Sequence, residues 1–319
     1  MKPLVSVVIP AYNMGDFVGP CINSVLNQNY TNFEIIIVND GSHDNTETIC
    51  SEFAKQNSNV LLITQENQGV SVARNNGIAM SHGDYILFLD ADDTLPPNAI
   101  NDLVVAAQKY NSDMTIGKMS PEEEMPIGIF TGEEFLIKCL EDSTISHFCW
   151  RILFKREFLK DITFPKGIIC GEDSYMVFKC AAKKPTVATI NECVYKYTAN
   201  PNSVTRSTFT HKRYDSLWTV LNKKEAIISN DFPHLLDLFY HLKVKTLMRL
   251  LAVLSNTKGT EFKKEERETL LHFNNVKSFF RANLDSSNAD FYNILSNNGY
   301  FKYKLKLKLK HMIRNMLNR

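Results

Sequence analysis

The sequence predicts an α/β fold with a mostly parallel central sheet and flanking helices. Over the first 110 residues, short runs of β-branched residues alternate with segments that have the apolar spacing of amphipathic helices. Several of the runs are apolar throughout, which is typical of strands buried on both faces of a parallel sheet. With 319 residues, the chain is long enough to bury one such domain and an appended second one.

The elements of the first part follow one another in strand–helix order. A strand run at 4–10 is followed by a helix pattern at 16–27 that gathers its apolar residues on one face. The same order then repeats, with strands at 33–40, 60–64 and 85–90 and helices at about 44–55, 71–80 and 97–110. Strands separated by helices pair in parallel through right-handed crossovers, so their carboxyl ends should gather at one edge of the sheet.

The second part is less regular. A strand pattern at 113–117 is followed by an acidic loop bounded by prolines at 121–126 and by a helix start at Thr131. A second helix is expected at 171–183 and an alternating strand at 186–197. The helix start has the capping-box spacing from Thr131 to Glu134. From about His211 the apolar spacing is helical, so we expect one domain over 1–208 and a helical region over 209–319.

Composition excludes several classes of protein. The formal net charge of +1 gives no global basic field of the kind that nucleic-acid-binding proteins show. The seven cysteines include no CxxC pair, so neither a zinc site nor a disulfide framework is indicated. The sequence has neither a signal-peptide pattern at its start nor an apolar run long enough to span a bilayer. We therefore expect a cytoplasmic protein whose membrane contact, if any, is peripheral.

Polar residues follow three of the predicted strands, in Pro10-Ala11-Tyr12-Asn13, Asn39-Asp40-Gly41-Ser42 and Asp90-Ala91-Asp92-Asp93. Open α/β sheets bind ligands at this edge. Three carboxylates so close together repel one another unless a cation lies between them, and Mg²⁺ or Mn²⁺ with a diphosphate is the usual arrangement. The alternative is a polar turn that caps the next helix.

These strand ends offer what a nucleotide requires. They supply an aromatic ring for the base, a carboxylate to accept an imide N–H, and small residues where the backbone approaches the ligand closely. The chain contains neither GxGxxG nor GxxxxGK[ST], so a glycine-rich phosphate loop does not explain the pattern. We therefore expect the phosphates to be held through a metal ion.

Four motifs in order resemble the catalytic domain of glycosyltransferase family 2, which has the GT-A fold. They are Ser6-Val-Val-Ile-Pro-Ala-Tyr-Asn13, Ile37-Val-Asn-Asp-Gly-Ser42, Asn67-Gln-Gly-Val-Ser-Val-Ala-Arg-Asn-Asn-Gly77 and Asp90-Ala-Asp-Asp93. The resemblance is strong over 4–117, weaker over 145–208, and absent beyond about 212. It implies a nucleotide-sugar half at 1–117 and an acceptor half at 118–208.

The resemblance implies a UDP-sugar as donor. Tyr12 and Asp40 are similar to the residues that stack on uracil and accept its N3–H, and Pro10 and Ala11 to the backbone wall of that pocket. Arg74 is similar to the basic residue beside the nucleotide. The alternatives are that Tyr12 packs at the end of its strand and that Arg74 is a surface residue of its helix.

The same resemblance assigns the acidic motif to Mn²⁺ or Mg²⁺. Asp92 is similar to the direct metal ligand, Asp90 to the residue that faces the ribose and the metal, and Ala91 lies between them at the donor. Asp93 is expected to be a supporting or helix-capping carboxylate.

Gly171-Glu172-Asp173 opens a predicted helix, where acidic residues are favoured by the helix dipole alone. Inverting sugar transfer also requires a base that takes the proton of the acceptor hydroxyl. Relatives keep a Glu-Asp pair here, which implies that Asp173 is the base and that Glu172 orients it. We expect the helix N-terminus to lower the pKa of Asp173.

Further residues are similar to segments of the family that surround the site. The segment 202–207 resembles a flexible loop that closes over the diphosphate, with Ser203 and Arg206 as candidate contacts; the alternative is a surface turn. His211 is a candidate for a further phosphate or metal contact, but as a lone histidine it is expected to be structural. Trp150 either stacks on an acceptor sugar or packs in the core. Relatives often have a lysine where Ile152 stands, and Arg151 is the candidate substitute.

No acidic residue follows Asp290, and the tail 301–319 is cationic and amphipathic. Such a tail is suited to an anionic membrane surface, where each Lys or Arg contributes about 1 kcal/mol. The alternative is a solvated terminal helix packed on the protein. Nothing else in the chain supports binding of nucleic acid.

Together these observations predict an inverting glycosyltransferase on the inner face of the cell membrane. It would transfer a hexose or N-acetylhexosamine from a UDP-sugar to a glycan or lipid-linked glycan of capsule, lipooligosaccharide or O-antigen. The helical region is either a surface for a homo-oligomer or only a platform for the first domain. The alternatives are a sugar-nucleotide pyrophosphorylase, although the glycine- and lysine-rich loop of that class is missing after the first strand, and a sugar-nucleotide-binding module without transfer activity.

Overall fold

The structure is a computed structural model that describes all residues except 1, 142–147, 201–208, 257–260, 280–291 and 293–319. The chain divides into two compact units. The first comprises Met1–Cys139 and Ser143–Thr208, and the second comprises Leu140–Asp142 and Phe209–Arg319. Each unit is described by itself.

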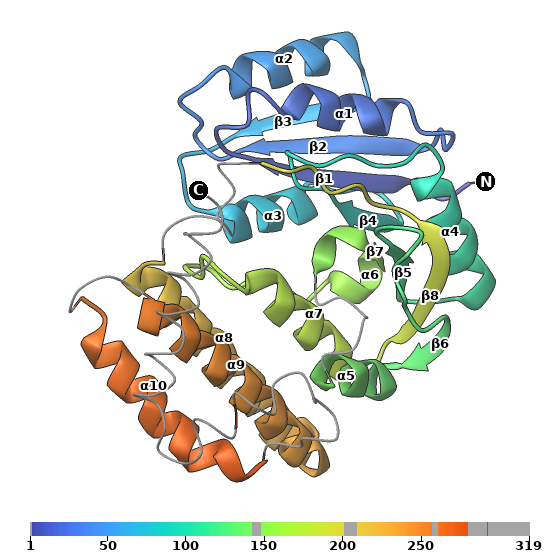
Figure 1. Cartoon of the computed structure of the whole chain (residues 1–319). Helices are drawn as coiled ribbons and strands as arrows, with labels where there is room; N and C mark the ends of the chain where they lie inside the picture. Colours follow the sequence, from blue (N-terminus) through green and yellow to red (C-terminus); the bar gives the residue numbers. More distant parts are fainter. Residues whose placement is uncertain (1, 142–147, 201–208, 257–260, 280–291, 293–319) are drawn as a thin grey trace. The chain divides into compact units, whose positions relative to one another are not determined.

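The first unit contains an eight-stranded sheet in the order β3-β2-β1-β4-β7-β5-β8-β6 (Figure 1). The strands are β1 (Val5–Ala11), β2 (Phe33–Asn39), β3 (Val60–Thr64), β4 (Tyr85–Phe88), β5 (Met114–Lys118), β6 (Gly128–Thr131), β7 (Ile152–Lys155) and β8 (Thr186–Cys193). The pairs β1–β2, β1–β4, β2–β3 and β5–β8 are parallel, whereas β7 and β6 pair antiparallel with their neighbours. The predicted α/β class with a mostly parallel sheet is confirmed.

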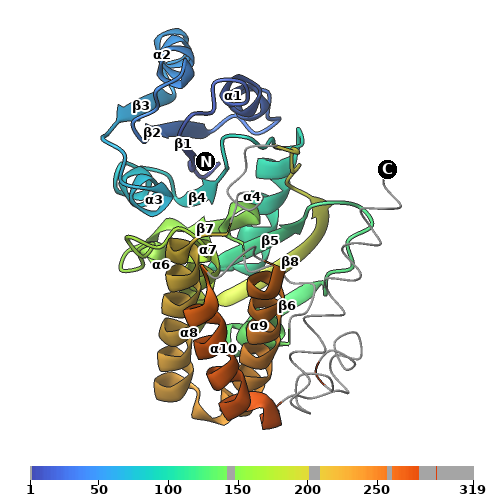
Figure 2. The same cartoon turned by 60° about the vertical axis from the view of Figure 1, so that its left-hand side comes forward.

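Helices cover both faces of the sheet. In order they are α1 (Val18–Leu26), α2 (Thr46–Gln56), α3 (Val70–Ala79), α4 (Ala99–Tyr110), α5 (Gly132–Leu140), η1 (Cys149–Arg151), α6 (Arg156–Leu159) and α7 (Glu172–Ala182). Both views place α1 and α2 on one face of β1–β3 and α3 on the other (Figures 1 and 2). The predicted capping box at the start of α5 is present, because the Thr131 amide donates to Glu134 (2.8 Å) and the Glu134 amide donates to Thr131 Oγ1 (3.2 Å).

The apolar sequence of β1 explains its position in the sheet. All seven residues of the strand are buried, because β2 and β4 flank it and helices cover both faces. On one face α3 approaches so closely that a Cβ added to Gly77 would lie 2.3 Å from Cγ1 of Val8. Glycine is therefore required at this position for the helix to pack against the strand.

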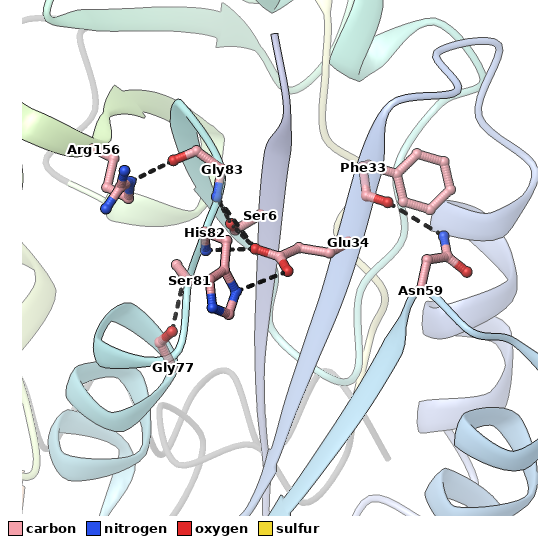
Figure 3. Close-up of polar contacts among 9 residues, drawn as sticks. All are labelled: Ser6, Phe33, Glu34, Asn59, Gly77, Ser81, His82, Gly83 and Arg156. Carbon is pink, nitrogen blue, oxygen red and sulfur yellow. Dashed lines mark hydrogen bonds and ion pairs between the residues drawn. The ribbon is translucent and has the colours of Figure 1, made fainter.

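The amino-terminal ends of β1, β2 and β4 are joined by the Glu34 carboxylate (Figure 3). Its Oε1 accepts hydrogen bonds from the Ser6 hydroxyl (2.5 Å) and from the amides of His82 (2.7 Å) and Gly83 (3.2 Å). Burial alone would raise the pKa of Glu34, but the bonds from Ser6 and His82 outweigh it and lower the pKa. This network holds the edge of the sheet opposite to the predicted ligand edge.

The second unit is helical. It contains α8 (His211–Asp231), η3 (Pro233–Leu235), α9 (Leu236–Asn256), α10 (Lys263–Val276) and η4 (Lys277–Phe279). Two clusters of buried apolar side chains lie within it, one around Leu247 and Phe273 and the other around Leu250 and Phe262. No helix in the described part of the chain is both long and apolar enough to cross a membrane.

Candidate active site

The three polar strand ends predicted from the sequence do meet at one edge of the sheet. Val5 of β1 pairs with Phe33 of β2 and with Tyr85 of β4, and all three strands run in the same direction. At the carboxyl ends of β1 and β2, Ala11 pairs with Asn39. Tyr12 and Asp40 directly follow this pair, so they lie on neighbouring segments of the chain. Asp90 follows the last residue of β4 by two positions.

Tyr12 is not packed into the core. Its side chain is 41% exposed, and its ring meets that of His43 edge-on, with 6.4 Å between the centroids. Pro10 and Ala11 are buried in β1 behind it, and the Ala11 carbonyl accepts the Asp40 amide (2.8 Å). An exposed ring over a buried strand end can receive a planar base by stacking.

Asp40 is held in place by the loop between β3 and α3. Its Oδ1 accepts hydrogen bonds from Gln65 Nε2 (2.7 Å) and the Gln68 amide (2.8 Å), and its Oδ2 accepts from the Gly69 amide (2.8 Å). An ionised carboxylate has about four acceptor positions, so one remains for a further donor. The carboxylate is thus immobilised and can still accept an imide N–H.

Gly41 makes this arrangement possible. Its φ of +71° lies in the left-handed region, and an added Cβ would be 2.8 Å from the Asn67 amide nitrogen. Any side chain here would strain the backbone and push the loop away from Asp40.

Arg74 joins two groups of acids. Its Nη2 lies 2.9 Å from Oδ1 of Asp90 and its Nη1 lies 2.9 Å from Oε1 of Glu172, while the guanidinium covers the Phe164 ring at 5.2 Å. The Arg74 side chain is only 4% exposed, so the surface-residue alternative is wrong. Through this one cation, α3 brings the acidic end of β4 next to the start of α7.

Asp90 and Asp92 are partly buried, and Ala91 between them packs in the core. Asp92 Oδ2 accepts a hydrogen bond from Asn200 Nδ2 (2.9 Å). Burial, and then repulsion from Asp90, raise the pKa of Asp92. A buried carboxylate beside another is the environment that a divalent cation stabilises.

The donor set fits Mg²⁺ or Mn²⁺ if a substrate supplies the remaining ligands. Among the residues described, no group of three or more His, Cys, Asp or Glu side chains is placed to hold a metal ion. Mg²⁺ usually takes one or two carboxylates together with substrate phosphates and water, rather than a complete protein cage. Asp92 and Asp90 are the residues that would hold it.

Asp93 has a structural position. Its two oxygens accept hydrogen bonds from the Tyr195 hydroxyl (2.6 Å) and the Thr198 amide (2.7 Å), and burial raises its pKa to about 7. The Tyr195 ring in turn meets Trp150, with 4.2 Å between centroids. Trp150 is 8% exposed, so it packs in the core, with the half-exposed ring of Phe148 stacked on its outer side at 5.3 Å.

Glu172 and Asp173 form the first turn of α7. Asp173 Oδ1 accepts the Ser174 amide (2.7 Å). Burial and the negative charge of Glu172 raise the pKa of Asp173 to about 7, and the positive charge of Arg74 opposes them. The expected lowering by the helix N-terminus is wrong, because desolvation and a like charge outweigh the dipole.

Two basic residues that the sequence singled out have structural partners. Arg151 is buried, and its Nη1 pairs with Oε1 of Glu123 at 2.6 Å. His211 begins α8, where its Nδ1 lies 2.6 Å from Oε1 of Glu265. His211 is therefore structural, as expected, and Arg151 supports a loop.

The remaining predicted contacts lie outside the residues that the structure describes. They are Ser203, Arg206 and the basic tail 301–319. Conversely, Asn200 and Tyr195 hold the acidic motif but were not predicted as site residues. The alternating pattern at 186–197 includes Tyr195, yet nothing in the sequence indicates that either residue reaches back to the acids.

The mostly parallel sheet with helices on both faces is the GT-A fold of glycosyltransferases. The family profile described as glycosyl transferase family 2 matches residues 6–180. The chain therefore belongs to glycosyl transferase family 2.

Two relatives come from Streptococcus pneumoniae serotype 4. Glycosyltransferase GlyG is 31% identical over 70% of this chain and 80% of its own length. Glycosyltransferase GlyA is 28% identical over 71% of this chain, but the match spans only 35% of GlyA.

Solved structures share the fold at low identity. S. aureus TarS 1-349 in complex with UDP-GlcNAc is 18% identical, with a TM-score of 0.70 over 98% of this chain and 92% of that one. The mannosyltransferase PcManGT from Pyrobaculum calidifontis, in complex with GDP-Man and Mn²⁺, is 17% identical, with a TM-score of 0.60 over 98% of this chain and 88% of that one.

Proposed function

We propose that the chain transfers a hexose or N-acetylhexosamine from a UDP-sugar to a hydroxyl group of a glycan acceptor, with inversion. The observation that carries this proposal is the position of Arg74. It bonds to Asp90, beside the candidate metal ligand Asp92, and to Glu172, beside the candidate base Asp173. A donor-binding group and a proton acceptor thus lie on either side of one cation.

The donor would bind along the carboxyl ends of β1, β2 and β4. The exposed Tyr12 ring would stack on uracil, and the free acceptor position of Asp40 would take its N3–H. That TarS crystallises with UDP-GlcNAc supports a uridine donor for a chain of the same fold. Ser203 and Arg206 remain proposed contacts of the diphosphate.

A divalent cation bound by Asp92 and Asp90 would neutralise the charge that develops on the departing diphosphate. The Mn²⁺ in the PcManGT complex supports a metal in this fold. Arg74 would keep Asp90 in a fixed orientation, and Asn200 does the same for Asp92 through its amide.

Transfer would proceed as a single displacement. Asp173 takes the proton of the acceptor hydroxyl while that oxygen forms a bond to the anomeric carbon. The bond from the anomeric carbon to the diphosphate oxygen breaks, and UDP leaves from the opposite face, which inverts the configuration. A carboxyl pKa raised to about 7 provides an effective base near neutral pH.

The acceptor would be a growing cell-surface polysaccharide or lipooligosaccharide, free or lipid-linked. The basic tail 301–319 would bring the enzyme to the anionic inner surface of the membrane. Pelleting of the full chain with phosphatidylglycerol vesicles but not with neutral vesicles, lost when the tail lysines become glutamines, would support this part.

The test of the transferase is UDP release from a panel of UDP-sugars with Mn²⁺. We expect release with one donor, loss of release on adding a chelator, and a decrease of about 10²–10⁴-fold in Asp173→Asn. Asp161→Asn, a change of an exposed aspartate in the same unit, is the matched control. UDP binding without release in any acceptor mixture would favour a non-catalytic binding module instead.

A further inference from the structure

An open cavity of about 520 Å³ lies at the carboxyl end of β5. It is lined by Lys118, the last residue of β5, and by the acidic loop 121–126. Its volume falls in the range of small-molecule sites, about 300–1,000 Å³. None of the residues assigned above to the donor, the metal or the base lines it.

The loop that forms the cavity is anchored. Glu123 Oε1 accepts from Arg151 (2.6 Å) and Glu123 Oε2 accepts from the Met119 amide (2.7 Å). At the other end, the Pro126 carbonyl accepts from the Thr189 hydroxyl (2.6 Å). The loop is therefore tied to η1 through Glu123 and to β8 through Pro126, and the cavity is preformed.

Lys118 is the unusual member of the lining. It is only 9% exposed, yet its ammonium group makes no hydrogen bond or ion pair with the residues that the structure describes. Its nitrogen is not among the buried polar atoms that lack a partner, so it opens onto the cavity, where a ligand that supplies oxygen atoms can replace the water that it meets. This feature, and not the acidic loop alone, indicates a binding site.

The strand register places the cavity beside the candidate active site. Leu87 of β4 pairs with Leu153 of β7, which pairs with Thr115 of β5. Asp90 and Lys118 each lie three residues beyond this row. The segments that carry Asp90 and Lys118 are two strand spacings apart. This distance is about 10 Å, which is the scale of one or two sugar rings.

We propose that this cavity binds a neutral sugar of the acceptor glycan. The Lys118 ammonium would donate to ring or hydroxyl oxygens, and Glu122 and Glu124 would accept from sugar hydroxyls. Since Arg151 neutralises Glu123, one lysine faces two glutamates, and the net negative charge disfavours a phosphate-bearing acceptor. This inference rests on the proposed transferase function, because it names the acceptor class of that enzyme.

Saturation-transfer NMR on the full chain tests the proposal. The neutral probes are methyl β-glucoside, methyl β-galactoside and N-acetylglucosamine, and the anionic probe is glycerol 3-phosphate. We expect a signal from at least one neutral probe, about tenfold weaker in Lys118→Met because a charged hydrogen bond is lost. The control Lys160→Met changes an exposed lysine of the same unit and should keep the signal.

The double variant Glu122→Lys/Glu124→Lys provides an independent arm. Both glutamates are exposed, so the fold should tolerate the change, and the reversed charge should create binding of glycerol 3-phosphate. The proposal is overturned if no neutral probe binds, if Lys118→Met binds as well as the wild type, or if the wild type prefers glycerol 3-phosphate.

UDP release from UDP-sugars, measured on the same preparation, separates the two hypotheses. Release of UDP from a donor, together with sugar binding that is unchanged in Lys118→Met, would refute only the cavity assignment. Absence of release with every donor, together with sugar binding that depends on Lys118, would refute only the transferase.

Discussion

Arg74 is a buried cation that lies between two acidic groups of the candidate site. Its guanidinium satisfies Asp90 and Glu172 at 2.9 Å each, and both acids come from other elements than its own. A buried ion pair of this kind contributes little net stability, but removing one partner leaves a charge buried without compensation. Arg74 is therefore a residue whose replacement should affect stability as well as activity.

We expect Arg74→Met to lower the free energy of unfolding by about 3 kcal/mol, because Glu172 and Asp90 lose their counter-charge. In Arg74→Met/Glu172→Gln part of this loss should be recovered, since one unpaired charge is gone. Denaturant unfolding of the two single variants and the double variant measures the coupling. Strictly additive losses would show that Arg74 and Glu172 do not interact.

The pH dependence of transfer should report the environment of Asp173. With its pKa raised to about 7, Asp173 is protonated and inactive as a base below that pH, so kcat/KM should fall as the pH is lowered through about 7. Glu172→Gln removes the repulsion that raises the pKa and should move this acid limb to lower pH. An acid limb that stays in place in Glu172→Gln would contradict the assignment.

At this scale the sequence predicts which acids gather at the site but not how they ionise. Asp90, Asp92, Glu172 and Asp173 can be predicted because strand ends and helix starts are local features. The groups that set their environment are distant in the chain, since Asn200 contacts Asp92 across 108 positions and Arg74 contacts Glu172 across 98. Burial and the like charge of Glu172 therefore raise the pKa of Asp173, whereas the sequence predicts a lowered pKa.

Among the elements, α3 has a demanding position, because it carries Arg74 and packs directly on β1. We expect Gly77→Ala to destabilise the protein, although alanine favours helices by up to about 1 kcal/mol over glycine. The added methyl group would lie 2.3 Å from Cγ1 of Val8, so the Val8 side chain or α3 itself must shift. Thermal unfolding should show a lower Tm.

Val8→Ala in the same chain provides the control for this prediction. It removes the atoms that the new methyl group meets, so the double variant should be more stable than the sum of the two single losses predicts. If Gly77→Ala raises the Tm on its own, α3 has room to move away from β1.

The elements that could be predicted are those with local patterns. The alternating strands and helices up to α4 lie close to their expected positions, because each has its own apolar spacing. The strands β6 and β7 were not predicted. Each has only four residues, and each becomes a strand by pairing with a partner more than 30 residues away, which no local pattern indicates.

For the whole molecule, the division into two units predicts two unfolding transitions. The residues proposed to bind UDP and the metal all lie in the first unit. UDP with Mn²⁺ should therefore stabilise one transition, by about 2.7 kcal/mol at a ligand concentration of 100 times the Kd, and leave the other unchanged. Calorimetry with and without a chelator measures the difference. Equal shifts of both transitions would show that the units unfold together.

The place of β7 in the sheet has a consequence during synthesis. Ile152–Lys155 is the only described strand that bridges β4 and β5, and it is translated after both. A nascent chain can assemble β1 to β4 early, but β5 has no neighbour in the sheet until β7 leaves the ribosome. On arrested chains, proteolysis should find Met114–Lys118 accessible before that point and protected after it. The candidate sugar cavity, whose wall is Lys118, is thus completed late in translation, after the nucleotide edge of the enzyme has formed.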